Sequence, residues 1–213
     1  MASTAAPPER PGRVYEPDLE PKAGDPTWGV VDLHPRQGAW TREEFLALES
    51  NRSVELVDGF LDVLPVPRMS HQEIADWLVA KLKDRLGRRA ACTAPFPVGT
   101  IRENYREPDA VATTDPGGLP EDSCEHATFV VEVVSEKKRD RRRDYVTKRS
   151  EYAAAGIQEY WIVDPSDLVV LQLVLDGDVY REAGRFAAGD VVRSEAVPGF
   201  EVSVDELFEA VPR

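Results

Sequence analysis

Thr128-Phe-Val-Val-Glu-Val-Val134 is the stretch of sequence that most constrains the fold. A short, continuous run of apolar and β-branched residues is typical of a strand that is buried on both faces. Glu132 lies inside this run, and burying an ionised carboxylate is costly unless a cation or hydrogen-bond donors meet it. Two readings follow: a structural arginine holds Glu132 near the end of the strand, or Glu132 belongs to a functional site.

The segments around this strand alternate between helix and strand patterns. Upstream, capping-box patterns at Thr41–Glu44 and Ser70–Glu73 predict helix starts, and Asp58-Gly59 predicts a hairpin turn. Further strands are expected over residues 97–105, 109–114, 158–165 and 168–175, and further helices over 140–155 and after Ser203. Strands interleaved with helices predict a mixed α/β domain.

The first 39 residues differ from the rest of the chain. They contain seven prolines and no apolar periodicity, which predicts an extended, flexible N-terminal extension ahead of a folded domain over residues 40–213. The sequence contains no uncharged apolar stretch of the ~18 residues that a membrane-spanning helix needs. Its start lacks the pattern of a signal peptide. Two cysteines, Cys92 and Cys124, cannot form a disulfide framework, which favours a reducing, cytoplasmic setting.

The net charge of −13 argues against a protein that coats nucleic acid, but the charge is unevenly distributed. Residues 136–149 hold eight Lys or Arg against three acids, whereas residues 164–213 hold eleven acids against four Arg. The basic stretch directly follows the Glu132 strand. A polyanion could therefore dock beside Glu132, although a solvated helix start has the same pattern.

Asp109 and Lys148 are the next candidates for chemistry. Asp109 opens a strand after Pro108, although an acid at such a position is often only a turn residue. Lys148 shares one helix face with Tyr145 and Tyr152, and this face should meet the sheet. Lys148 can then deliver a cation to a buried carboxylate, or it can cover apolar surface with its stem and reach water.

Three weaker candidates complete the set. Glu55 lies between apolar residues of the predicted hairpin, where an outward-facing position is the plain alternative. His71 lies in the first turn of the second predicted helix, where surface or capping contacts are common, and Asp144 lies at the margin of the Lys148 face.

These residue types suit metal-assisted hydrolysis of a phosphodiester. Two carboxylates can hold a hard cation such as Mg²⁺ through oxygen atoms. The cation polarises the phosphate and lowers the pKa of a water, and an ammonium stabilises developing negative charge. The sequence contains no glycine-rich phosphate loop, serine nucleophile elbow or zinc-type His/Cys set that would indicate another chemistry.

The order of these residues resembles the PD-(D/E)XK nuclease signature and, more specifically, the Uma-two restriction endonuclease family. The resemblance covers residues 40–205. The matching pieces are Glu55-Leu-Val-Asp-Gly59, His71-Gln-Glu-Ile74, Pro108-Asp109, Val130-Val-Glu-Val-Val-Ser135, Asp144-x-x-x-Lys148-x-x-x-Tyr152, Gly156-Ile157 and Glu159-Tyr-Trp-Ile-Val-Asp164-Pro165.

This resemblance implies an α/β fold with a restriction-endonuclease-like core, in which helices flank a mixed β-sheet. It implies that Asp109 and Glu132 bind a metal and that Glu55 is an accessory acid. The signature lysine should follow Glu132 by two residues, but position 134 is valine. In this family a lysine on the next helix takes that role, which corresponds to Lys148.

The sequence therefore predicts a Mg²⁺- or Mn²⁺-dependent endonuclease that acts on DNA. Lys148, Glu55, Asp109 and Glu132 would be catalytic, and His71 and Asp144 accessory. One alternative is a catalytically inactive nucleic-acid-binding or regulatory module of the same fold, and another is a protein-interaction module that uses the acidic C-terminal part. A homodimer is expected only by analogy with nucleases that cut both strands.

Overall fold

The structure is a computed structural model that describes residues 35–48, 53–135 and 141–209. The chain divides into residues 1–36 and 37–213, and all elements below belong to the second unit. Most of the predicted Pro-rich extension lies outside the described residues, so its flexible character stays a prediction. Among the described helices, none combines the length and apolar character that a membrane span needs.

A six-stranded mixed sheet forms the centre of the fold, with strand order β10-β9-β8-β7-β6-β3. β7 and β8 run parallel, and each of the other neighbouring pairs in this sheet is antiparallel. The strands are β3 Ala91–Thr93, β6 Ala110–Ala112, β7 Phe129–Val133, β8 Glu159–Asp164, β9 Val169–Asp176 and β10 Val179–Phe186. The parallel pair needs a crossover connection, which the π-helix η2 (Arg143–Lys148) and helix α5 (Arg149–Ala154) provide.

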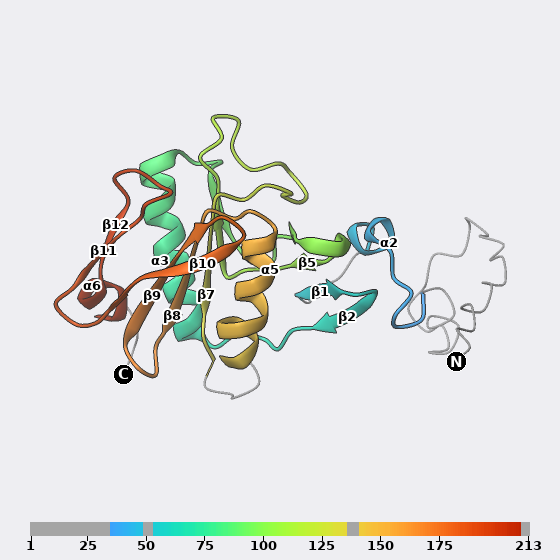
Figure 1. Ribbon diagram of the computed structural model, residues 1–213, viewed down its shortest axis with the longest axis horizontal. Helices are drawn as coiled ribbons and strands as arrows, with labels where there is room; N and C mark the ends of the chain where they lie inside the picture. Colours follow the sequence, from blue (N-terminus) through green and yellow to red (C-terminus); the bar gives the residue numbers. More distant parts are fainter. Residues whose placement is uncertain (1–34, 49–52, 136–140, 210–213) are drawn as a thin grey trace. The chain divides into compact units, whose positions relative to one another are not determined.

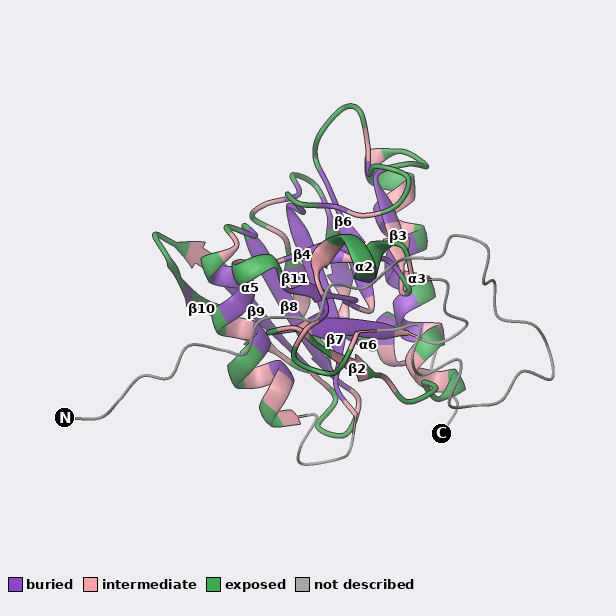
Figure 2. Ribbon diagram, turned by 90° about the vertical axis from the view of Figure 1, so that its right-hand side faces the viewer, coloured by how far each residue is buried: buried purple, intermediate pink, exposed green. Residues whose placement is uncertain are grey.

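Helices cover both faces of this sheet (Figure 1). Helix α3 (Met69–Leu86), helix α6 (Val204–Glu209) and the hairpin of β11 (Val191–Arg193) and β12 (Glu201–Ser203) contribute to the core on one face. Helix α5 contributes to the core on the other face. All residues of β7 are buried, which confirms that the 128–134 segment forms a strand covered on both sides (Figure 2).

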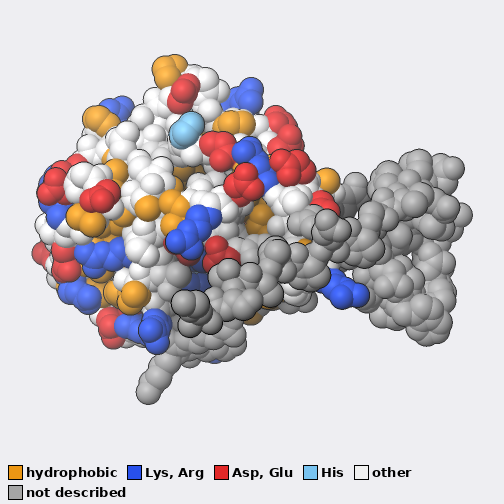
Figure 3. Space-filling model, turned by 45° about the vertical axis from the view of Figure 1, so that its right-hand side comes forward, with side chains coloured by type: hydrophobic (Ala, Val, Ile, Leu, Met, Phe, Trp, Pro, Cys, Tyr) orange, Lys and Arg blue, Asp and Glu red, His pale blue; other side chains and the backbone are white. Residues whose placement is uncertain are grey.

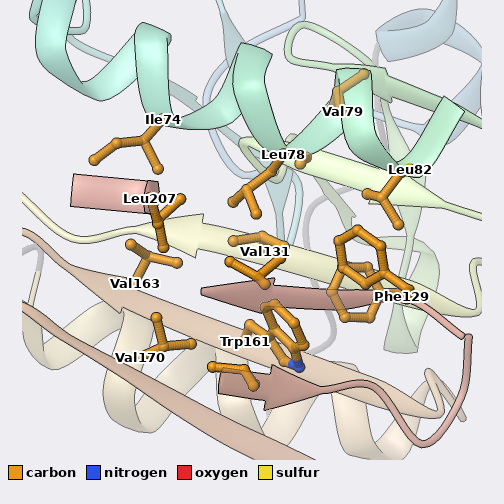
Figure 4. Close-up of a cluster of buried hydrophobic side chains, with 14 of the residues drawn as sticks. Ile74, Leu78, Val79, Leu82, Phe129, Val131, Trp161, Val163, Val170 and Leu207 are labelled. Carbon is orange, nitrogen blue, oxygen red and sulfur yellow. The ribbon is translucent and has the colours of Figure 1, made fainter. Parts of the chain in front are cut away.

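The alternation of side chains along β7 assigns its residues to these two cores. Phe129, Val131 and Val133 belong to the α3 core, and Val130 and Val134 to the α5 core. Figure 4 shows the α3 core, with Ile74, Leu78, Val79 and Leu82 packed over Phe129, Val131, Trp161, Val163 and Val170. Leu78 and Leu82 are fully buried, so truncating either to alanine should cost about 2–5 kcal/mol.

A second, four-stranded sheet has the order β2-β1-β5-β4. Its strands are β1 Val54–Val57, β2 Phe60–Val63, β4 Val98–Gly99 and β5 Tyr105–Arg106, with the 3₁₀ turn η1 (Ile101–Glu103) and helix α2 (Arg42–Leu46) nearby in the sequence. The predicted hairpin is confirmed: β1 and β2 pair across Asp58 and Gly59, whose φ values are 48° and 78°. Positive φ at both positions is what a two-residue type I′ turn requires.

β2 is the edge strand of this sheet, and Gln37 covers part of its outer side. The side-chain Nε2 of Gln37 donates to the Leu61 carbonyl at 3.4 Å, and the Leu61 amide donates to Gln37 Oε1 at 2.7 Å. The amide group of Gln37 thus pairs with the edge of β2 as a neighbouring strand would.

Two predicted details are wrong. Helix α3 begins at Met69 after Arg68, which makes no side-chain capping bond, and Ser70 already lies within the helix. Ser70 therefore lacks the extended backbone that an N-cap residue needs. The predicted strand over residues 97–105 is interrupted by η1, where Arg102 and Glu103 have positive φ.

Candidate active site

Glu132 contacts two side chains of the crossover connection, one from η2 and one from α5. It lies on β7 on the face toward α5, and its side chain is 4% exposed. Lys148 Nζ is 2.7 Å from Glu132 Oε1, and the Tyr152 hydroxyl donates to the same oxygen at 2.6 Å. Because the Lys148 side chain is only 1% exposed, it does not reach solvent. The cation that meets Glu132 is a lysine rather than a structural arginine.

A second carboxylate, Glu55 of β1, contacts the same lysine. Lys148 Nζ lies 3.0 Å from Glu55 Oε1, and Arg106 Nη1 lies 2.8 Å from Glu55 Oε2. The Arg106 guanidinium also makes a bidentate pair with Glu151, at 2.7 and 2.8 Å. Glu55 is fully buried, so the outward-facing reading of this position is wrong. The two sheets are thereby linked by a buried network of alternating charges.

Asp109 directly precedes the neighbouring strand β6 and lies near Glu132. β6 and β7 pair antiparallel, with Ala110 opposite Val131, so Asp109 stands at the end of β6 where Glu132 follows on β7. Besides burial, the charge of Asp109 contributes to the raised pKa of Glu132, which shows that the two carboxyl groups are close. Asp109 Oδ2 accepts a hydrogen bond from the Val133 amide at 2.7 Å, which fixes the carboxylate at this end of the sheet.

His71 joins the site from the first helical residues of α3. Its Nε2 lies 3.2 Å from Asp109 Oδ2, and its side chain is about one-fifth exposed. Burial lowers the pKa of His71, but the hydrogen bond and charge of Asp109 outweigh burial and raise it above its ordinary value. His71 therefore contacts a candidate metal ligand instead of making a capping contact.

Asp144 and Lys148 both belong to the π-helix η2 and are both buried. A π-helix bonds each amide to the carbonyl five residues back, and π segments occur frequently at functional sites. Asp144 Oδ1 is 3.3 Å from Arg143 Nε, and the Asp144 carbonyl accepts a bond from the Tyr160 hydroxyl at 3.0 Å. Burial raises the pKa of Asp144, against the lowering effect of Lys148.

The pKa values of the two carboxyl groups that contact Lys148, those of Glu55 and Glu132, are shifted in opposite directions. Burial raises the pKa of Glu55, but Lys148 and Arg106 outweigh it and hold the value at about 2. Burial also raises the pKa of Glu132, to about 8, where Lys148 opposes and Asp109 adds to the effect. For Lys148 itself, burial lowers the pKa, but Glu132 and Glu55 raise it above its ordinary range. Its Nζ is therefore an ammonium at neutral pH.

Asp109 and Glu132 are the residues that could hold a metal ion. Their side chains are 17% and 4% exposed, so an ion would approach from the Asp109 side. Within the described ranges, no three His, Cys, Asp or Glu side chains lie close enough together to form a metal cluster. Mg²⁺ is commonly bound through one or two carboxylates, with water and substrate oxygens completing the shell. The donor set of this site fits that ion.

Sequence reasoning missed Arg106 and Glu151 and gave Tyr152 no role. Glu151 and Tyr152 follow Lys148 by three and four residues, so helical spacing was a usable signal for both. Arg106 had no such signal, because its partner Glu55 lies 51 residues away in the chain.

The predicted basic stretch can be placed only in part, since residues 136–140 lie outside the described residues. Arg141 pairs with Asp164 at 2.6 Å and with Asp167 at 3.1 Å, so it has a structural role. Arg142 is exposed, and Arg143 lies toward Asp144. In Figure 3, the Lys and Arg side chains on the visible face lie in small groups among acidic ones.

The fold resembles a crystal structure from Anabaena variabilis ATCC 29413 described as "a putative nuclease belonging to DUF820". The match covers 80% of this chain and 98% of that chain, with a TM-score of 0.62 and 17% sequence identity. It confirms the predicted fold class, a mixed β-sheet flanked by helices, and shows that the two proteins share this α/β fold.

The family follows from the sequence itself. Residues 42–205 match the model of the Uma2 (Uma-two) family, described as "Putative restriction endonuclease". The chain belongs to this family, which confirms the predicted resemblance. No curated protein matches the chain.

Proposed function

We propose that the protein is a metal-dependent endonuclease that hydrolyses phosphodiester bonds of DNA with Mg²⁺ or Mn²⁺. The observation that carries the proposal is that the Asp109 carboxylate is fixed by the Val133 amide next to Glu132, and that the Lys148 ammonium lies 2.7 Å from Glu132. The description of the Uma2 family supports the reaction class. DNA as the substrate and the identity of the metal belong to the proposal alone.

Each residue of the site has a role in this reaction. Asp109 and Glu132 would hold the metal ion, which when bound polarises the scissile phosphate and lowers the pKa of a water. Lys148 does not act as a base, because its raised pKa keeps it protonated. It orients Glu132 and supplies positive charge beside the position where negative charge develops on the phosphate. Glu55, which remains ionised, contacts the same ammonium at 3.0 Å.

His71 and Asp144 have supporting roles in the proposal. His71 fixes the orientation of the Asp109 carboxylate through the 3.2 Å contact. Asp144 adds negative charge near Glu132, which contributes to the raised pKa of that carboxyl. Neither residue is needed as a metal ligand, so replacing either should weaken turnover less than replacing Asp109 or Glu132.

Cleavage of supercoiled plasmid DNA by the purified protein, with Mg²⁺ or Mn²⁺ and with EDTA as the blank, tests the proposal. Asp109→Asn and Glu132→Gln keep the shape of each side chain and remove its charge, so each should abolish metal-dependent cleavage. Circular dichroism shows whether each variant is folded. Cleavage that survives in both folded variants would contradict the assignment.

The alternative is an inactive nucleic-acid-binding or regulatory module of the same fold. One observation favours it: Lys148 and Tyr152 both bond Glu132 Oε1, which is also what a purely structural carboxylate would show. Calorimetric titration of the protein with Mn²⁺ separates the two functions. The endonuclease requires binding that is lost in Glu132→Gln, whereas the inactive module requires DNA binding that is independent of metal.

A homodimer forms part of the endonuclease proposal, because paired sites allow both strands of a duplex to be cut. Analytical ultracentrifugation of the free protein and of its DNA complex tests it.

A further inference from the structure

A groove of about 580 Å³ lies next to the Glu55–Lys148 pair. One wall is the β1–β2 hairpin, which includes Val57 and Phe60, and the other wall is η2 with the residue that precedes it. Arg106, which bonds Glu55, also lines the groove. The volume falls within the ~300–1,000 Å³ typical of small-ligand sites.

The hairpin wall presents an exposed aromatic ring on the catalytic face of its sheet. The register pairs Val57 with Phe60 and Glu55 with Asp62. Because side chains alternate along a strand, these four residues share one face, and Glu55 shows that this face looks toward Lys148. Phe60 is 53% exposed, which is unusual for a phenylalanine of a paired strand.

The Phe60 ring is also held in place from one side. A Cβ atom at Gly38 would lie 3.0 Å from Phe60 Cζ, a tight contact, and the φ of Gly38 is +85°, a conformation that favours glycine. The Gly38 amide donates to the Gly59 carbonyl at 2.8 Å, which fixes this backbone against the hairpin turn. The ring is thus positioned but remains open on its exposed side.

The opposite wall carries positive charge. Arg142, which is exposed, lines the groove together with Arg143 and Thr147. Asp58 and Asp62 lie on the hairpin wall, so the two walls differ in charge. A ligand with an anionic backbone on one side and an aromatic, amino-bearing group on the other matches this division.

We infer that this groove binds one unpaired nucleotide of a DNA strand, next to the site of cleavage. The base stacks on Phe60, while Arg142 contacts a flanking phosphate. Stacking on an aromatic side chain together with a basic track along the backbone is the usual way in which proteins bind single strands. The inference rests on the proposed endonuclease function, and it identifies the substrate class as single-stranded or locally unpaired DNA.

The geometry favours an unpaired base over an intact duplex. In a duplex the faces of the bases are covered by their neighbours, so Phe60 could stack only on a base that is unstacked or flipped out. The groove volume of about 580 Å³ has room for one nucleotide but not for a turn of a B-form duplex.

Fluorescence anisotropy with a labelled oligodeoxycytidylate, whose bases carry an amino group, and with a labelled duplex of equal length, tests the inference in EDTA, where no cleavage occurs. The full-length protein should bind the single strand more tightly than the duplex. Phe60→Ala should weaken single-strand binding by ~5- to 150-fold and leave duplex binding unchanged. Phe60→Tyr keeps a ring and should restore binding. Arg142→Ala should lower the salt dependence of single-strand binding by about 0.7 in the log–log slope.

Val179→Ala provides the matched control. Val179 is a 61% exposed apolar residue of the β9–β10 hairpin, which does not line the groove, so this substitution should leave binding unchanged. Equal binding of single strand and duplex, or single-strand binding that Phe60→Ala does not weaken, would overturn the inference. Either result leaves the proposed function intact as long as Glu132→Gln abolishes cleavage. Conversely, Phe60-dependent binding without any metal-dependent cleavage would remove the proposed function and leave the nucleotide site.

Discussion

The Lys148→Met substitution removes the ammonium from the centre of the buried network and keeps most of the volume of the side chain. Lys148 contacts Glu132 at 2.7 Å and Glu55 at 3.0 Å, and its side chain is 1% exposed. Removing one partner of a buried ion pair leaves the other charge uncompensated, which typically costs about 3–5 kcal/mol. We expect a loss of this size in the free energy of unfolding.

The size of this loss should depend on pH. Burial raises the pKa of Glu132 to about 8 with Lys148 present, and loss of the ammonium raises it further. Above about pH 8 the carboxyl is then ionised in the wild type but protonated in the variant. When a carboxyl is protonated in the folded protein but ionised in the unfolded chain, the free energy of unfolding falls by about 1.4 kcal/mol for each unit by which the pH rises. Between pH 8 and pH 9 the wild type itself loses only about 0.4 kcal/mol, because Glu132 is already half ionised at pH 8, so the stability difference between the two proteins should widen by about 1 kcal/mol.

Urea unfolding followed by circular dichroism at pH 6, 8 and 9, in EDTA, measures this difference. Lys81→Met is the matched control, since Lys81 pairs with Glu206 at 3.1 Å on the surface, and exposed pairs contribute at most about 1 kcal/mol. A Lys148→Met variant that loses less than about 1 kcal/mol, or whose deficit is the same at pH 8 and pH 9, would refute the buried network as the environment of Lys148.

Three further predictions concern the surroundings of the site. Arg106→Met removes the bidentate partner of Glu151 and should destabilise the protein by about 3–5 kcal/mol in the same urea assay. Tyr152→Phe deletes the 2.6 Å hydrogen bond to Glu132 and should cost about 1.5–3 kcal/mol, with a smaller loss contradicting that bond. Burial raises the pKa of Glu107 from 4.5 to about 7, so the stability associated with its proton is complete below pH 4.5 and is lost as the pH rises through 7. Glu107→Gln should therefore melt at a higher temperature than the wild type at pH 8 but not at pH 4, and equal melting curves at pH 8 would count against this environment.

Patterns within a single element predicted most of the fold. The apolar run over residues 128–134, the Asp58-Gly59 turn and the helical period behind Lys148 each depend on contacts that are close in sequence, and the structure contains all three elements. The three-residue strand β3 was not predicted, because so short a segment carries no detectable period.

The interruption of the 97–105 segment also lacked a local signal. Positive φ at Arg102 and Glu103 is rare for residues other than glycine and asparagine, so the sequence there reads as a plain strand. The same limit applies to the site: the inward direction of Lys148 could be predicted from the helix, but its second partner Glu55 comes from the other sheet. Contacts between distant segments have no signature in one sequence.

The amide of Gln37 has a consequence for the solubility of the isolated domain. An edge strand with unpaired backbone groups can pair with a strand of another molecule, and such pairing leads to aggregation. Gln37 bonds the outward amide and carbonyl of Leu61 in the middle of β2, so these groups are not free to pair with another chain. The exposed apolar side chains of Phe60 and Val63 on the same strand would favour such pairing. A protein truncated after Gln37, so that it starts at Gly38, would keep every residue of the site and yet expose this edge. We expect such a protein to associate with itself more readily than one that retains Gln37.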